Sequence, residues 1–291
     1  MIDLKFHVYS IAGIFLALAI GMIIGNAMNR DTNLTAENSK IMKRYADTVN
    51  ILKKQLDDSQ LQKQQNIRQM DADEAFIASV AEKLNRDSLT GRNITLVSFG
   101  KNENVTAGLK KNIEQAGGAV INTVVIKNSF INKPRTEATD KLLAETGQGV
   151  IEDTRQLQAK IYGLLAKLIS EPGSEELFKA FSKSKIVTMT GDFSAPCDSA
   201  VLIIDSTRDI FKDPDSVTRL ASSLKNAGVF AAGADSSGKT DTLSVWDNEQ
   251  IPYADNADSA LGAYSLVRIL AEKQGKYGLN GKTGRTFPDT E

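Results

Sequence analysis

VYSIAGIFLALAIGMIIGNAMN, residues 8–29, carries no charged side chain. As an α-helix rising 1.5 Å per residue, this stretch is about 33 Å long, enough to cross the hydrocarbon core of a bilayer. A cleaved signal peptide is the alternative interpretation, because residues 25–27 (GNA) fit a small-x-small cleavage pattern. The apolar run is longer than the usual core of a signal peptide, so we predict an uncleaved transmembrane anchor over residues 1–29.

Small residues recur every fourth position along this predicted helix, which places them on one face. They are Gly13, Ala17, Gly21 and Gly25. Small side chains at this spacing let two membrane helices approach closely, although glycine and alanine are also simply common in such helices. We expect this face to pair two anchors.

No glycine or proline interrupts residues 27–90, so the sequence predicts one long helix beyond the anchor. Apolar residues recur there at heptad spacing, which indicates a coiled-coil stalk over residues 30–90. The predicted seam consists of Met42, Tyr45, Val49, Leu52, Leu56, Met70, Ile77, Val80 and Leu84, interrupted by Ser59, Lys63, Asn66 and Asp73. A helix folded back on the C-terminal domain is the alternative, and we expect a parallel homodimer or pairing with a second coiled-coil membrane protein.

The composition restricts the possible functions. Among 291 residues there is one histidine, His7, and one cysteine, Cys197, which excludes most zinc and copper sites, CxxC metal knuckles and an intrachain disulfide. A formal net charge of −1 gives no indication of a nucleic-acid partner.

From residue 91 onward, short apolar runs alternate with helical patterns. Strands are predicted at 93–100, 119–126, 185–192, 200–205 and 229–235, and helices at 105–115, 137–145, 151–170, 175–183, from 213 to 228 and at 259–272. We expect Asp258 to cap the last of these helices. The alternation predicts a mostly parallel, doubly wound α/β domain over residues 91–291.

Three aspartates, Asp192, Asp205 and Asp235, follow predicted strands. Ligands of doubly wound sheets bind beyond the carboxyl ends of the strands, so three carboxylates converging there could hold Mg²⁺ or Ca²⁺. We favour the alternative, in which each aspartate caps a turn or a following helix.

The segment GADSSGKT, residues 233–240, matches the phosphate-loop pattern GxxxxGK[ST]. The matching residues are Gly233, Gly238, Lys239 and Thr240. A phosphate loop continues directly into a helix, whereas DTLSVWDNEQIP follows here, so we favour a Gly/Ser/Asp loop between strands over a nucleotide site.

The opening residues KFHVYSIAGIFLALAIGMIIGNAM resemble the start of the mycobacterial copper transport protein B (MctB) family, in which an HxxSIAxxFLALxxG anchor leads into a coiled coil and an α/β domain. Residues 254–259 (ADNADS), Gly262 and the GKYG turn at 275–278 are similar to the family's C-terminal signature. The resemblance implies a role in copper transport or tolerance at the cell envelope, with the C-terminal domain on the extracytoplasmic side. SteB-type relatives instead imply a non-enzymatic scaffold for envelope assembly or division.

The basic residues that flank the anchor favour the opposite orientation, since Arg30, Lys40, Lys43 and Arg44 follow it and Lys5 precedes it. Direct copper binding has little support in the residues, because Cu(I) prefers clustered soft ligands. Only Met22 and Met28 lie near each other among the methionines. We therefore expect no catalytic residues and no bound cofactor, and a copper role that depends on assembly.

Overall fold

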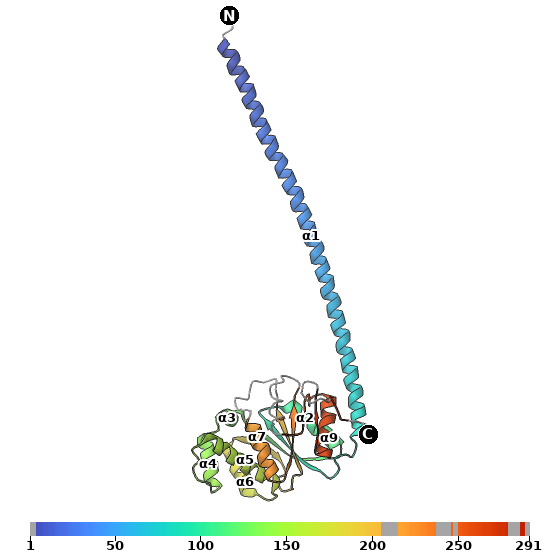
Figure 1. Cartoon of the computed structure of the whole chain (residues 1–291), viewed down its shortest axis with the longest axis vertical. Helices are drawn as coiled ribbons and strands as arrows, with labels where there is room; N and C mark the ends of the chain where they lie inside the picture. The colour runs from blue at the N-terminus through green and yellow to red at the C-terminus, as the bar shows by residue number, and fades with distance from the viewer. Residues whose placement is uncertain (1–3, 205–214, 237–245, 247–249, 279–285, 289–291) are drawn as a thin grey trace. The chain divides into compact units, whose positions relative to one another are not determined.

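The computed structural model describes residues 4–204, 215–236, 246, 250–278 and 286–288, with the side chains of helix α1 described over 7–28 and 37–84. The chain divides into two compact units, residues 1–70 and 71–291 (Figure 1).

Helix α1 (Leu4–Leu84) is continuous over 81 residues, which confirms the prediction of one unbroken helix that includes the apolar stretch. It ends several residues earlier than residue 90. Two features stop it: Asp87 adopts a φ of 60°, and Leu89 is fully buried, with its N–H donating to the carbonyl of Ala116 at 2.9 Å. The chain therefore leaves the helical path in order to place Leu89 in the core of the second unit.

Within the residues that the structure describes, one seven-stranded sheet forms the centre of the second unit. Its strands are β1 (Asn93–Phe99), β2 (Ala119–Ile126), β3 (Val187–Gly191), β4 (Ser199–Ile204), β5 (Phe230–Asp235), β6 (Tyr253–Ala254) and β7 (Lys276–Tyr277), in the order β3-β2-β1-β4-β5-β6-β7. All neighbouring pairs are parallel except β2 and β3, which are antiparallel. The mostly parallel α/β fold is thus confirmed. The sequence predicted five strands and missed β6 and β7, which span only two residues each.

The helices after α1 are α2 (Glu103–Gln115), α3 (Asn128–Asn132), α4 (Glu137–Glu145), α5 (Thr154–Ser170), α6 (Glu175–Ser184), α7 (Asp215–Asn226) and α9 (Ala260–Glu272). Buried side chains of β1 divide between two clusters. Val97 and Phe99 pack with residues of α5 and α7, whereas Ile94 and Leu96 pack with residues of α2 and α9. Alternate side chains of a strand point to opposite faces, so this sheet has a packed core on each side.

Helix α9 begins differently from the prediction. Ser259, not Asp258, is its N-cap, and the Ser259 hydroxyl accepts a hydrogen bond from the N–H of Gly262 at 3.1 Å. Both residue types are good caps, so the sequence alone did not distinguish them. The short helix α3 was not predicted.

Candidate functional site

The N-terminal part of α1 is, among the described residues, the one helix long and apolar enough to cross a membrane, over His7–Met28. Its small-residue face is open. A Cβ atom added at Gly13, Gly21 or Gly25 would meet nothing within 4 Å. Two such faces could approach closely, so pairing of the anchors stays a prediction that the geometry permits.

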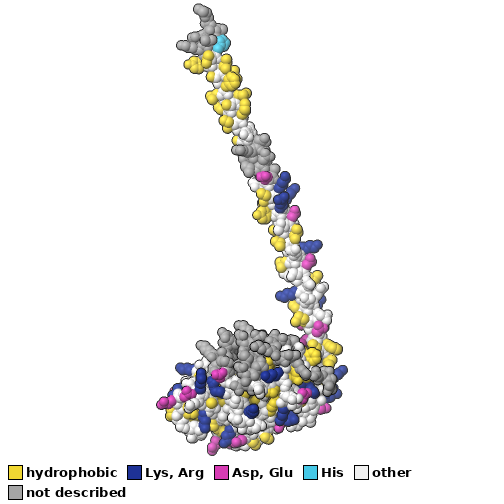
Figure 2. All heavy atoms as spheres, viewed as in Figure 1, with side chains coloured by type: hydrophobic (Ala, Val, Ile, Leu, Met, Phe, Trp, Pro, Cys, Tyr) yellow, Lys and Arg dark blue, Asp and Glu magenta, His cyan; other side chains and the backbone are white. Residues whose placement is uncertain are grey.

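The predicted stalk seam is exposed along the first unit. Leu52 and Leu56 each expose 58% of their surface, and Met42 and Met70 each expose 68%. Figure 2 shows hydrophobic side chains along this part of α1. Large apolar side chains this exposed, at heptad spacing, are typical of a helix whose partner lies outside the single chain.

The last turns of α1 belong to the second unit and contact α9. The carboxylate of Glu74 accepts a hydrogen bond from the N–H of Ala260, in the first turn of α9. The amide of Asn85 donates to the carbonyl of Tyr264 at 3.5 Å. A carboxylate at a helix N-terminus is stabilising, because it satisfies an unpaired N–H and faces the positive end of the helix dipole. Sequence reasoning missed this contact, since the two segments are far apart in the chain.

The one cysteine of the chain is poorly suited to binding copper. Cys197 exposes 8% of its surface, and its thiol donates a hydrogen bond to the carbonyl of Ser199 at 3.0 Å. Burial raises the pKa of the Cys197 thiol above its ordinary value. Metals bind the thiolate, so the protonated thiol favoured here is a weak ligand. Within the described ranges, no three His, Cys, Asp or Glu side chains gather closely enough to hold a metal ion.

The strand-end aspartates do not all meet. Because β3 is antiparallel to β2, Asp192 lies at the edge where the parallel strands begin, and its N–H donates to the carbonyl of Ile121 at 2.9 Å. Its carboxylate accepts bonds from the Ser194 hydroxyl at 2.6 Å and from the Ser194 N–H at 2.8 Å, which lower the pKa of Asp192. Asp235 is buried at the opposite edge, at the end of β5, and Asp205 lies outside the described residues. Asp192 therefore does not share a crevice with Asp235 and instead stabilises a turn, as the favoured alternative predicts for this residue.

Gly233, the first glycine of the phosphate-loop pattern, lies inside strand β5. Its N–H donates to the carbonyl of Pro252 at 2.8 Å, and an added Cβ would lie 2.8 Å from the ring of Trp246. In a phosphate loop this glycine follows the strand and approaches a phosphate, whereas here it makes room for a buried indole. Gly238, Lys239 and Thr240 lie outside the described residues.

The C-terminal signature surrounds a buried carboxylate at the start of α9. Asp255 is 4% exposed, and the amide of Asn256 donates to its Oδ1 at 3.0 Å. Added Cβ atoms would lie 2.1 Å from the Asp255 carboxyl carbon at Gly278 and 2.1 Å from the Asn256 carbonyl oxygen at Gly262. Asn256 itself has a φ of 47°, in the left-handed region. Gly262 and Gly278 of the signature are thus explained by close packing.

Comparisons with known proteins agree with these features. The family model described as copper transport outer membrane protein, MctB, matches residues 1–288. Relatives named copper transporter MctB from Mycobacterium bovis and Mycobacterium tuberculosis are 26% identical over 162 residues, which cover 55% of this chain and 48% of theirs. The Mycobacterium leprae relative is 27% identical over 163 residues, with the same 55% and 48% coverage. This chain therefore matches about half the length of these curated relatives.

Among solved structures, the catalytic subunit of M. Jannaschii aspartate transcarbamoylase matches over 63% of this chain and 64% of its own, at 9% identity and a TM-score of 0.17. So low a score supports no argument about this chain. The family model, in contrast, extends from the apolar helix to the end of the α/β domain, and the chain belongs to the MctB family.

Proposed function

We propose that this chain serves copper homeostasis at the cell envelope as a membrane-anchored, self-associating protein that is not an enzyme and does not itself bind copper. The observation that carries the proposal is α1, in which one uninterrupted helix contains both the apolar stretch and the exposed stalk seam. The description of the family as copper transport proteins supports the copper role.

The exposed seam supports self-association. Apolar side chains such as Leu52 and Leu56 are mostly exposed in the single chain, and a second copy of the same helix would bury them at matching positions. The small-residue face that includes Gly13 and Gly21 would pair the anchors in the same parallel orientation. A single apolar helix cannot line a pore, so any passage for copper would need an assembly of this kind or a second membrane protein.

The proposal that the chain does not bind copper itself rests on its soft ligands. Cys197 is buried and its protonated form is favoured. His7 is the one histidine of the sequence, and an imidazole alone is an incomplete copper site.

A scaffold for envelope assembly or division is the second candidate function. Lys63 and Asn66 interrupt the seam, and polar residues at such positions specify register and partner at some loss of stability. A seam of this kind suits docking of a second coiled-coil membrane protein as well as self-pairing.

A complementation experiment tests the proposal. A deletion strain of the source organism is grown with increasing copper and complemented with the wild-type chain, with His7→Ala/Cys197→Ser, or with Leu56→Lys. We expect the deletion to cause copper sensitivity that the wild type and the His7/Cys197 variant relieve and Leu56→Lys does not. The matched control is Leu61→Lys, because Leu61 is 57% exposed but lies outside the seam.

Two results would contradict the proposal. Failure of a stable, membrane-bound His7/Cys197 variant to restore growth in copper would indicate direct ligation. A deletion strain that tolerates copper normally but divides abnormally would favour the scaffold.

A further inference from the structure

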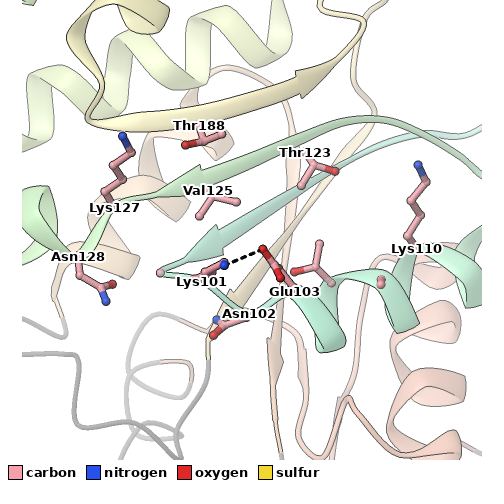
Figure 3. Close-up of a pocket in the computed structure, with 12 residues that line it drawn as sticks. Lys101, Asn102, Glu103, Lys110, Thr123, Val125, Lys127, Asn128 and Thr188 are labelled. Carbon is pink, nitrogen blue, oxygen red and sulfur yellow. Dashed lines mark ion pairs between the residues drawn. The ribbon is translucent and has the colours of Figure 1, made fainter.

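An open cavity of about 580 Å³ lies beside α2, over β1, β2 and β3, and Thr188 is among the residues that line it. Lys101 and Glu103, which also line it, form an ion pair at 3.1 Å with side chains that are 76% and 73% exposed (Figure 3). Ion pairs this exposed are common on protein surfaces and indicate no particular ligand. A more selective surface lies at the end of α1 that belongs to the second unit.

Three large apolar side chains remain exposed at this end of α1. Phe76, Val80 and Leu84 expose 69%, 36% and 47% of their surfaces. They recur at every fourth position, so they share one face of the helix. A continuous apolar face of this kind, with a phenylalanine mostly in solvent, is typical of a surface that binds another protein.

The opposite side of the same helix end contacts α9 of its own chain. The carboxylate of Glu74 accepts a hydrogen bond from the N–H of Ala260, and Ile77 and Ala81 are half-buried. Glu74 and Phe76 are two positions apart, which is about 200° around an α-helix, so Phe76 faces away from this contact. The face that contains Phe76 is therefore left uncovered by the part of the second unit that the structure describes.

The heptad assignment indicates what lies on each flank of the seam in a parallel pair. Val80 and Leu84 are seam positions, Phe76 directly precedes a seam position (g), and Glu74 and Ala81 directly follow seam positions (e). In a parallel coiled coil the g flank of one helix faces the e flank of the other. Phe76 of one copy then lies between Glu74 and Ala81 of the second copy, on the flank that contacts the α9 of that second copy. Ala81 is small, so it leaves room for an aromatic ring beside it.

We propose that Phe76 of one copy packs on a second copy of the chain where α1 meets the start of α9, so that each α9 contacts both stalk helices. A second copy is the occupant because the g flank of one helix and the e flank of the other meet in a parallel pair, and here the e flank already carries α9. The inference rests on the proposed parallel pairing of the stalks. It adds to that pairing a contact between the stalk of one copy and the α/β domain of the other.

Photocrosslinking of the full-length chain in detergent tests this contact. The photoreactive analogue p-benzoylphenylalanine replaces Phe76, and this chain is mixed, diluted and reconcentrated with a heavy-isotope copy of the wild-type chain. Mass spectrometry then distinguishes crosslinks between copies from crosslinks within one copy. We expect position 76 to crosslink to residues 257–264 of the heavy copy, at the start of α9. The same analogue at Leu61, which is 57% exposed and outside the seam, should give little crosslinking between copies.

Phe76→Ala provides a second measurement. Sedimentation of the full-length chain should show self-association weakened about 10- to 100-fold, because the burial of a mostly exposed phenylalanine is lost in both copies. Alanine forms helices better than phenylalanine, so this loss cannot come from unfolding of α1. Ile51→Ala, at a position that is 58% exposed and outside the seam, should keep the dissociation constant within about twofold of the wild-type value.

Pairing of the stalks themselves is measured separately, by disulfide formation through Leu52→Cys in a Cys197→Ser background. Disulfide dimers of Leu52→Cys without a crosslink from position 76 to the heavy α9 would overturn this contact and leave the stalk pairing intact. Absence of both would overturn the contact together with the stalk pairing. Equal crosslinking from positions 76 and 61, or equal dissociation constants for Phe76→Ala and Ile51→Ala, would also overturn the contact.

Discussion

Replacing Leu56 with lysine should weaken self-association of the full-length chain by about 30- to 1,000-fold. Leu56 exposes 58% of its surface in the single chain, and complete burial of an exposed leucine contributes about 1.5–3 kcal/mol, so burying the exposed part contributes roughly 1–2 kcal/mol per chain. A dimer contains two copies, which gives roughly 2–4 kcal/mol, and each 1.4 kcal/mol is a factor of ten in the dissociation constant. The unpaired lysine charges at the interface would add to the loss.

Sedimentation of the full-length chain in detergent, over a range of concentrations, measures this dissociation constant. Leu61→Lys introduces the same charge at an equally exposed leucine of the stalk, 57% exposed, which the heptad assignment places outside the seam. The dissociation constant of the Leu61→Lys control should stay within about twofold of the wild-type value, since surface substitutions have small effects. Equal dissociation constants for the Leu56 and Leu61 variants would refute the seam.

Three further predictions concern the second unit. Cys197 should react with iodoacetamide at pH 8 more slowly than a free cysteine, because its raised pKa leaves little of the reactive thiolate. The reaction rate should rise when urea unfolds the chain. A fast reaction in the folded chain would contradict the burial of this thiol. Gly233→Ala should lower the free energy of unfolding by about 1–3 kcal/mol, because the new Cβ would clash with Trp246. Gly163→Ala in α5, where a Cβ meets nothing within 4 Å, should raise the free energy of unfolding by about 0.5–1 kcal/mol. Urea unfolding measures both changes, and the same sign for the two variants would show the packing argument to be wrong. Glu74→Ala should lower the melting temperature of the second unit, through loss of about 1 kcal/mol at the start of α9, and an unchanged melting temperature would mean that this contact is not stabilising.

The long helix and the main strands could be predicted because their signals are local. The absence of glycine and proline over residues 27–90 indicates one helix beyond the anchor, and apolar runs such as 93–100 indicate buried strands. Strands β6 and β7 could not be found in this way. Each is two residues long, too short to show an alternating or apolar pattern.

The candidate sites depend more on tertiary structure than on local pattern. The direction of β3 places Asp192 away from Asp235 and brings Thr188 to the cavity beside α2, and no feature of residues 187–191 reveals that direction. The contact between Glu74 and α9 likewise joins segments 186 positions apart. The stalk seam and the anchor face, in contrast, are periodic features of the sequence, and their pairing partners remain predictions.

Cysteine crosslinking in native membranes tests most directly whether the stalks pair in parallel and in register. In a Cys197→Ser background, Leu52→Cys places one thiol on the predicted seam and Leu61→Cys places one, equally exposed, outside it; these two leucines are 58% and 57% exposed. In a parallel, in-register pair of stalks, the two copies of residue 52 face each other. We expect mild oxidation to give a disulfide-linked homodimer with Leu52→Cys and mainly monomer with Leu61→Cys. Monomer at both positions, equal dimer at both positions, or a Leu52→Cys crosslink to a different protein would contradict the account.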